Sequence, residues 1–176
     1  MNLLIVVDMQ KDFVDGALGT PEAVNILENV TAKMKSFDGD ILVTYDTHTE
    51  NYMESSEGKH LPVPHCIKGT PGWELHETVK KVLDEKEYTS IEKPTFGSVA
   101  LPEFLKEFYD TESLSVTLIG LCTDICVVSN ALLLKAHFPE MPIFVDASCC
   151  AGVTPESHNA ALTTMKMCQI HVIGEE

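Results

Sequence analysis

The sequence predicts a layered α/β domain in which helices cover a buried sheet of parallel strands. Two observations support this fold class. Apolar runs of about five to seven residues recur along the chain, and amphipathic stretches with helical spacing separate most of them. The chain is also 176 residues long, which matches one ordinary domain better than two joined by a linker.

Six segments are predicted to form the strands. Each is too short for a free-standing helix, and most are rich in Val, Ile or Leu. Parallel strands need covering connections between them, and those connections have one hand. In chain order the predicted strands are Leu3–Asp8, Ile41–Asp46, Tyr88–Lys93, Ser115–Leu121, Ile143–Ala147 and Gln169–Ile173.

Helices are predicted in most connections. The first begins at Pro21, with Thr20 as its N-cap, and carries apolar side chains at helical spacing from Val24 to Met34. Four more are predicted over Trp73–Leu83, Leu101–Phe108, Thr123–Ala136 and Pro155–Met167. The remaining segment, Thr47–Gly72, contains several prolines and glycines and has no clear period. Loops of that length are usually functional or disordered.

The charge balance argues against two classes of partner. The chain has 27 acidic and 12 basic residues, a formal charge of −15, and every basic residue is Lys. Nucleic acids and anionic membrane surfaces both need clustered cations, so neither is an expected partner. The sequence also lacks an apolar stretch of membrane-spanning length and a secretory pattern. We therefore expect a cytoplasmic protein with reduced thiols.

Reactive side chains follow four of the predicted strands. Asp8 ends the first strand, and Asp46 ends the second with His48 shortly after it. Lys93 ends the third strand, and Cys126 lies just beyond the fourth, at a predicted helix start. The carboxyl ends of parallel strands meet at one edge of a sheet, where ligands bind. The sequence therefore predicts a shared site at this edge.

Three of these side chains form a candidate catalytic triad. A cysteine in the first turn of a helix feels the positive end of the helix dipole, and a nearby Lys93 ammonium would further favour the Cys126 thiolate. Asp8 can take the thiol proton and hand it to a leaving amine. The predicted chemistry is attack of Cys126 on a carbonyl, expulsion of an amine and hydrolysis of the thioester. The backbone N–H groups of Cys122 and Cys126 are the expected donors to the oxyanion.

A second set of side chains is typical of a metal site. Asp46 and His48 are two residues apart, which places both on one face of an extended segment. His65 lies in the same irregular loop, and Glu54, Glu57 and His60 lie between. Mixed oxygen and nitrogen ligands suit zinc, iron or manganese better than a thiolate-rich structural zinc site.

Taken together, these residues resemble the isochorismatase-like cysteine hydrolases, and among them the bacterial nicotinamidases (pyrazinamidases). The resemblance spans essentially the whole chain. It rests on four motifs in order: Val6-Val7-Asp8-Met9-Gln10-Lys11-Asp12-Phe13, then Asp46-Thr47-His48 with Pro64-His65-Cys66, then Glu92-Lys93-Pro94 with Phe96, and finally Gly120-Leu121-Cys122-Thr123-Asp124-Ile125-Cys126-Val127.

The resemblance implies a specific fold and a catalytic role for the triad. The expected fold is a three-layer α/β/α, Rossmann-like domain with a six-stranded, mostly parallel sheet that spans residues 1–176. The resemblance assigns the triad to Asp8, Lys93 and Cys126. It also implies a cis peptide bond between Leu121 and Cys122, which turns a backbone N–H toward the oxyanion.

The resemblance also implies a divalent metal ion, with zinc expected first and iron or manganese as alternatives. Its ligands would be Asp46, His48, His65 and a fourth side chain, for which Glu57 is favoured over His60. In the family the pyridine nitrogen of the substrate coordinates the metal while the carboxamide reaches the cysteine.

Phe13 matches a family position that packs on the substrate ring, and Leu121 is expected to contact the substrate as well. Leu61 and Pro62 precede His65 where some relatives have Trp.

The implied activity is hydrolysis of a small-molecule amide, nicotinamide, to nicotinic acid and ammonia in NAD salvage, by a homo-oligomer. Pyrazinamide is the expected side substrate. The main alternative is another amidase of the superfamily that acts on a carbamoyl or ureido compound. Two further alternatives are a catalytically silent binding module and a metallohydrolase that uses metal-bound hydroxide. Isochorismatase itself is disfavoured, because its substrate is a dianion and this chain has no Arg.

Overall fold

The protein forms an all-parallel, six-stranded sheet with helices on both faces, which confirms the predicted α/β class. This description rests on a computed structural model, and it covers residues 1–175. The strand order is β3-β2-β1-β4-β5-β6, and every neighbouring pair is parallel. The strands are β1 (Asn2–Val7), β2 (Asp40–Asp46), β3 (Thr89–Lys93), β4 (Ser115–Leu121), β5 (Ile143–Ala151) and β6 (His171–Ile173).

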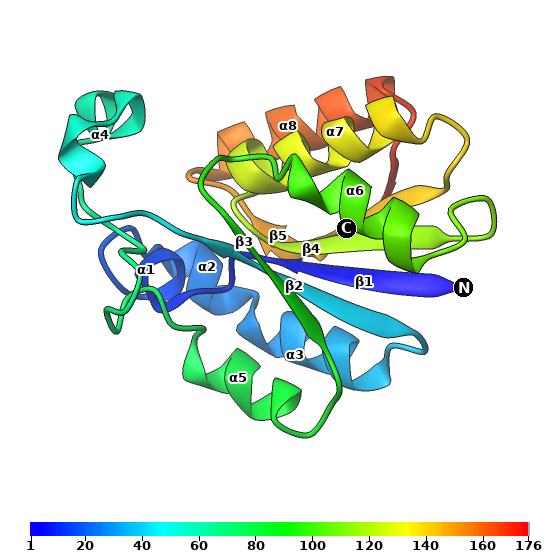
Figure 1. Ribbon diagram of the computed structural model, residues 1–176, viewed down its shortest axis with the longest axis horizontal. Coiled ribbons are helices and arrows are strands. Elements are labelled where there is room, and N and C mark those ends of the chain that lie inside the picture. The colour runs from blue at the N-terminus through cyan, green and yellow to red at the C-terminus, as the bar shows by residue number, and fades with distance from the viewer. Residues whose placement is uncertain (176) are drawn as a thin grey trace.

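The helices divide into two layers (Figure 1). One face of the sheet is covered by α6 (Ala100–Phe108), α7 (Val128–His137) and α8 (Pro155–Met167). The other face is covered by α2 (Pro21–Asn25), α3 (Leu27–Ser36) and α5 (Glu77–Leu83), with the short α1 (Lys11–Val14) beside α2. The short α4 (Ser56–His60) projects away from both layers. No helix within residues 1–175 is long and apolar enough to cross a membrane.

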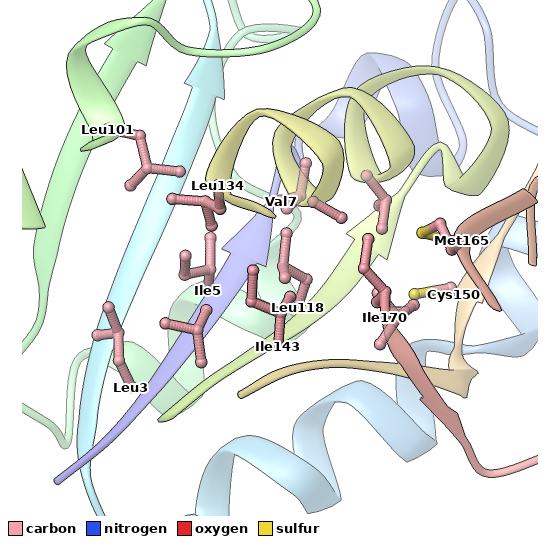
Figure 2. Close-up of a cluster of buried hydrophobic side chains, with 14 of the residues drawn as sticks. Leu3, Ile5, Val7, Leu101, Leu118, Leu134, Ile143, Cys150, Met165 and Ile170 are labelled. Carbon is pink, nitrogen blue, oxygen red and sulfur yellow. The ribbon is translucent and has the colours of Figure 1, made fainter. Parts of the chain in front are cut away.

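The strand β1 contributes to both hydrophobic cores, because its side chains alternate between the two faces of the sheet. Leu3, Ile5 and Val7 belong to the core under α6, α7 and α8, part of which is drawn in Figure 2. Leu4 and Val6 belong to the core on the opposite face. All five side chains are fully buried. A central strand that is apolar on both faces explains why the first run reads as a continuous hydrophobic segment.

The helix predicted from Pro21 through Met34 is two helices. It breaks at Ile26, whose amide donates to the Val24 carbonyl instead of continuing the helical ladder. The helix predicted over Trp73–Leu83 begins only at Glu77, because the His76 side chain caps it by accepting from the Thr78 amide.

The connection predicted as one helix over Thr123–Ala136 begins as a turn of π-helix, Thr123–Val127, which leads into α7. In contrast, the observed α8 matches the predicted Pro155–Met167.

Two strands differ from the prediction by more than one residue at an end. β5 continues to Ala151, four residues past its predicted end, and its pairing with β4 shifts register between Leu118 and Gly120. β6 begins later than predicted, because Gln169 has a left-handed backbone (φ 65°) and the Ile170 amide still donates to α8 at Met165. The long loop contains the 3-10 turn η1 (Tyr52–Glu54) and α4.

The strand register brings the reactive strand ends together. Asp46 is paired with Lys93 between β2 and β3, and Val7 is paired with Thr44 on one side and Gly120 on the other. Asp8, which follows Val7, therefore lies at the same edge of the sheet as Asp46 and Lys93. This edge is the one that the sequence predicts for the site.

Gly120 is required where β4 passes β1, and we predict that replacing it is costly. Its φ is +116°, and a Cβ there would overlap the Val7 carbonyl oxygen. We expect Gly120→Ala to lower the free energy of unfolding by about 3 kcal/mol or more, measured by urea denaturation. Gly69→Ala is the matched control, because Gly69 also has a positive φ but a Cβ there meets nothing within 4 Å. It should cost only about 1 kcal/mol, and equal losses for the two variants would contradict the overlap.

Candidate active site and metal centre

Lys93 lies at the centre of the site. Its side chain is fully buried, and Nζ lies 2.6 Å from Asp8 Oδ2 and 3.4 Å from Cys126 Sγ. The same ammonium donates to the Thr95 carbonyl at 3.2 Å and lies 3.5 Å from Asp46 Oδ1. The structure therefore brings together the three predicted triad residues.

Asp8 is held in one orientation by Thr44. The Thr44 hydroxyl donates to Asp8 Oδ1 at 2.6 Å, and the Asp8 amide donates back to that hydroxyl at 3.2 Å. Asp8 has an unusual positive φ of 48°. A strained backbone of this kind persists only where the surrounding contacts hold it in place. Its other oxygen, Oδ2, is buried and touches Lys93, but no donor within residues 1–175 is aligned to give it a hydrogen bond. Thr44 thus occupies one carboxylate oxygen, and the other faces the Lys93 ammonium.

The charge states of the triad follow from its burial. Burial raises the pKa of the Cys126 thiol well above its ordinary value, the Asp8 carboxylate raises it further, and Lys93 only partly opposes them. Burial likewise raises the pKa of Asp8 against the opposing effect of Lys93. Burial would lower the pKa of Lys93, but Asp8 and Cys126 more than reverse that effect. The buried Cys126 thiol therefore loses its proton less readily than a free cysteine, an effect of depth that local sequence spacing does not reveal.

The turn that carries Cys126 also carries the predicted oxyanion donors. The amides of Ile125 and Val127 donate to the Cys122 carbonyl at 3.1 and 3.0 Å, which closes the turn around the nucleophile. The peptide bond between Leu121 and Cys122 is cis, as the family resemblance implies. The backbone N–H groups of Cys122 and Cys126 lie at this strand-to-helix turn, and their role as oxyanion donors stays a prediction.

Beside the triad, four side chains form a compact group of metal-ligating type. One ligand atom from each of Asp46, His48, Glu57 and His65 lies within 4.8 Å of the others. His48 Nε2 is 2.9 Å from Asp46 Oδ2, and His65 Nε2 is 3.5 Å from Glu57 Oε1. His60, the alternative fourth ligand, is exposed, and its Nδ1 lies 2.8 Å from the Ser56 carbonyl instead.

This donor set fits a divalent cation. His48 Nε2 is buried and has no hydrogen-bond partner within residues 1–175. His65 Nδ1 lies 2.8 Å from the Val63 carbonyl, which places the ring proton on Nδ1 and leaves the Nε2 lone pair for the group. Burial alone would lower the pKa of His65, but the hydrogen bonds to Asp46 and Glu57 outweigh it and raise the pKa to about 10. The two carboxylates thus favour a positive charge at this position. Two carboxylates and two imidazole nitrogens are ligands that zinc, iron and manganese share.

Two polar residues that the site prediction left out, the buried Gln10 and the half-buried Asp12, hold the metal group in place. The side chain of Gln10 accepts from the Asp46 amide at 2.8 Å and donates to the Asp46 carbonyl at 2.9 Å. Asp12 Oδ2 accepts from the Cys66 amide next to His65. Both Gln10 and Asp12 belong to the first motif, so a polar residue within a few positions of a buried strand end was the available signal.

The triad and the metal group meet in one cavity of about 720 Å³. Cys126 and the four metal-group residues line it, whereas Asp8 and Lys93 are buried behind its wall. Phe13 and Leu121, the predicted substrate contacts, also line the cavity. The Phe13 ring centroid lies 5.3 Å from that of His65. The arrangement offers a nucleophile and a cation site to one small ligand.

Comparison with known proteins places this chain among relatives of the same architecture. It is 29% identical to the isochorismatase family protein PncA from Bacillus subtilis over 170 residues, which cover 91% of each chain. It superposes on pyrazinamidase/nicotinamidase from Streptococcus mutans with a TM-score of 0.84 and 28% identity, over 98% of this chain and 100% of the other.

A second solved structure carries a metal. Pyrazinamidase of Pyrococcus horikoshii in complex with zinc has a TM-score of 0.79 and 28% identity, over 99% of each chain. The family model of the isochorismatase domain matches residues 2–176. The fold, the arrangement of the site and this match lead to one assignment: the chain belongs to the isochorismatase family of hydrolases.

Proposed function

We propose that this protein is an amidohydrolase that converts nicotinamide to nicotinic acid and ammonia. The observation that carries the proposal is the contact of Asp8, Lys93 and Cys126 behind a cavity whose wall also holds the Asp46, His48, Glu57 and His65 group. Relatives from S. mutans and P. horikoshii that share the fold are named as nicotinamidase or pyrazinamidase. The cavity presents both a cysteine nucleophile and a metal group. A ligand such as nicotinamide matches both, because its carboxamide can meet the cysteine and the lone pair of its ring nitrogen can meet the metal group.

The first half of the reaction forms a thioester. Asp8 accepts the proton of the Cys126 thiol through Oδ2, the oxygen that Thr44 does not occupy, and the Lys93 ammonium stabilises the thiolate. The sulfur then bonds to the carboxamide carbon, and the carbonyl electrons move onto oxygen. The backbone N–H groups of Cys122 and Cys126 are proposed to stabilise that oxyanion. As the C–N bond breaks, Asp8 returns its proton to the nitrogen, and ammonia leaves.

The second half of the reaction releases the acid. Asp8, again a carboxylate, takes a proton from a water molecule as the water oxygen bonds to the thioester carbon. The C–S bond breaks and the proton passes back to Cys126. The products are nicotinic acid and the original thiol, so the base and the nucleophile return to their starting states.

Asp46, His48, Glu57 and His65 are the residues proposed to hold a divalent metal ion, with zinc first. When bound, such an ion supplies a Lewis acid that can accept the pyridine lone pair and so orient the ring. Zinc is supported by the nitrogen and oxygen ligand types and by the zinc complex of the P. horikoshii relative. Phe13 and Leu121 are proposed to pack on the ring, because both line the cavity.

Further proposals concern the whole protein. We propose that residues 1–176 act as one isochorismatase-like hydrolase domain, supported by two hydrophobic cores that share one sheet. A place in NAD salvage follows from the proposed substrate. The cytoplasmic location and the homo-oligomeric state stay predictions from the sequence and the family resemblance.

The proposed mechanism predicts that Cys126→Ala abolishes turnover but leaves the metal group intact. Removing the nucleophile should lower ammonia release from nicotinamide by about 10⁴-fold or more. Metal content should be unchanged, because Cys126 is not one of the four grouped residues. The measurement is ammonia release by both proteins, with bound metal recorded for each. If the Cys126→Ala variant still released ammonia and a chelator abolished that activity, the enzyme would be a metallohydrolase instead. If the wild-type protein released no ammonia from nicotinamide, carbamoyl and ureido compounds would become the leading candidate substrates.

A second prediction separates the two candidates for the fourth metal ligand. Glu57→Gln removes a carboxylate from the group and should weaken metal binding by at least about tenfold. His60→Gln should leave it unchanged, since His60 lies outside the group although it lines the same cavity. Competition of each variant against a chelator of known affinity measures the effect. Weaker binding in the His60 variant alone would reverse the assignment.

A further inference from the structure

Asn130 is a buried polar residue on an otherwise apolar face of α7. It is fully buried, as are Ala131 and Leu134 on the same side of the helix, and both of these belong to the core. A buried amide without partners is unfavourable, so a residue of this type in such a place needs hydrogen bonds, and these specify its position.

The Asn130 side chain makes three hydrogen bonds that tie two separate segments together. Nδ2 donates to the Cys126 carbonyl, one helical turn back, at 2.8 Å. The same nitrogen donates to the Phe96 carbonyl at 3.2 Å, and Oδ1 accepts from the Ser98 amide at 2.9 Å. One side chain thus links the turn of the nucleophile to the loop that follows β3.

That loop, residues 94–98, carries a direct contact to the catalytic lysine. The Thr95 carbonyl accepts from Lys93 Nζ, and the Thr95 hydroxyl donates to the Gly97 carbonyl and so closes the loop on itself. The loop also packs tightly against α7, since a Cβ on Gly97 would lie 3.3 Å from the Ser129 carbonyl oxygen. A change in the link from Asn130 therefore reaches the position of the Lys93 ammonium.

We infer that Asn130 is a positioning residue that holds the Lys93 ammonium and the Cys126 thiol at their working separation. Two of its hydrogen bonds, to the Phe96 carbonyl and the Ser98 amide, hold the loop whose Thr95 carbonyl accepts from Lys93. The third, to the Cys126 carbonyl, holds the residue that carries the sulfur. The 3.4 Å contact between Nζ and Sγ spans these two segments. This inference rests on the proposed function, because it concerns the same nucleophile.

The test compares four proteins in the zinc-loaded form. Asn130→Asp keeps the acceptor for the Ser98 amide but turns an oxygen toward the Phe96 and Cys126 carbonyls. Asn130→Thr can keep a hydrogen bond to the Cys126 carbonyl, four residues back, but cannot reach the loop. Asn159→Asp, at an exposed position of α8, is the matched control for the charge change. Wild type completes the set.

We expect kcat for nicotinamide to fall by about 10- to 100-fold in both Asn130 variants, because small misplacements of catalytic groups have effects of that size. KM and bound zinc should stay within about threefold of wild type, since Asn130 contacts neither the cavity nor the metal group. The pH midpoint for alkylation of Cys126 by iodoacetamide, followed by peptide mass spectrometry, should rise as the lysine moves away. The Asn159 variant should match wild type in every measurement.

Two results would overturn the inference. One is a kcat per folded, zinc-loaded molecule that matches wild type in Asn130→Thr. The other is a loss of thermal stability in both variants with an unchanged alkylation midpoint, which would make Asn130 merely structural. A wild type without activity on nicotinamide would instead defeat the proposed function, while the alkylation midpoint would still decide the role of Asn130.

Discussion

The buried ammonium of Lys93 requires anionic partners, and both halves of the site supply them. A charge removed from water is stable in a protein only when it is paired and hydrogen-bonded. Asp8 provides the closest partner at 2.6 Å, and Asp46 from the metal group lies 3.5 Å away. The catalytic base and a proposed metal ligand therefore share one counter-ion. The spacing of the nucleophile from the metal group follows from this shared contact.

The same ion pair lets a proton move inside the protein without a change in net charge. With the thiol protonated, Lys93 is balanced by the Asp8 carboxylate. With the proton on Asp8, it is balanced by the thiolate 3.4 Å away. The lysine contacts both groups, so neither state leaves an isolated charge in a medium of low dielectric. This explains how a thiol whose pKa is raised by burial can still serve as a nucleophile.

The fold class, and the edge of the sheet at which the candidate site residues gather, could be predicted because both depend on local sequence. Short apolar runs marked most of the strands, and the residues that follow them, such as Asp8, lie at one edge because the strands are parallel. The contacts that hold these residues could not be predicted. Thr44 meets Asp8 from 36 positions away, and Asn130 reaches a loop more than 30 residues earlier. Such pairs depend on strand order and register, which periodicity does not encode.

The central place of β1 has a consequence for how the chain folds during synthesis. This strand is synthesised before the other five strands of the sheet, yet one of its two neighbours is β4, so Asn2 pairs with Ser115. Its apolar side chains lack half of their covering until more than 100 further residues have been made. Contacts of such long sequence separation form slowly, and apolar strands with an open edge associate with other chains in the meantime. A nascent chain of this protein thus exposes an unpaired, apolar edge of β1 until β4 has been synthesised.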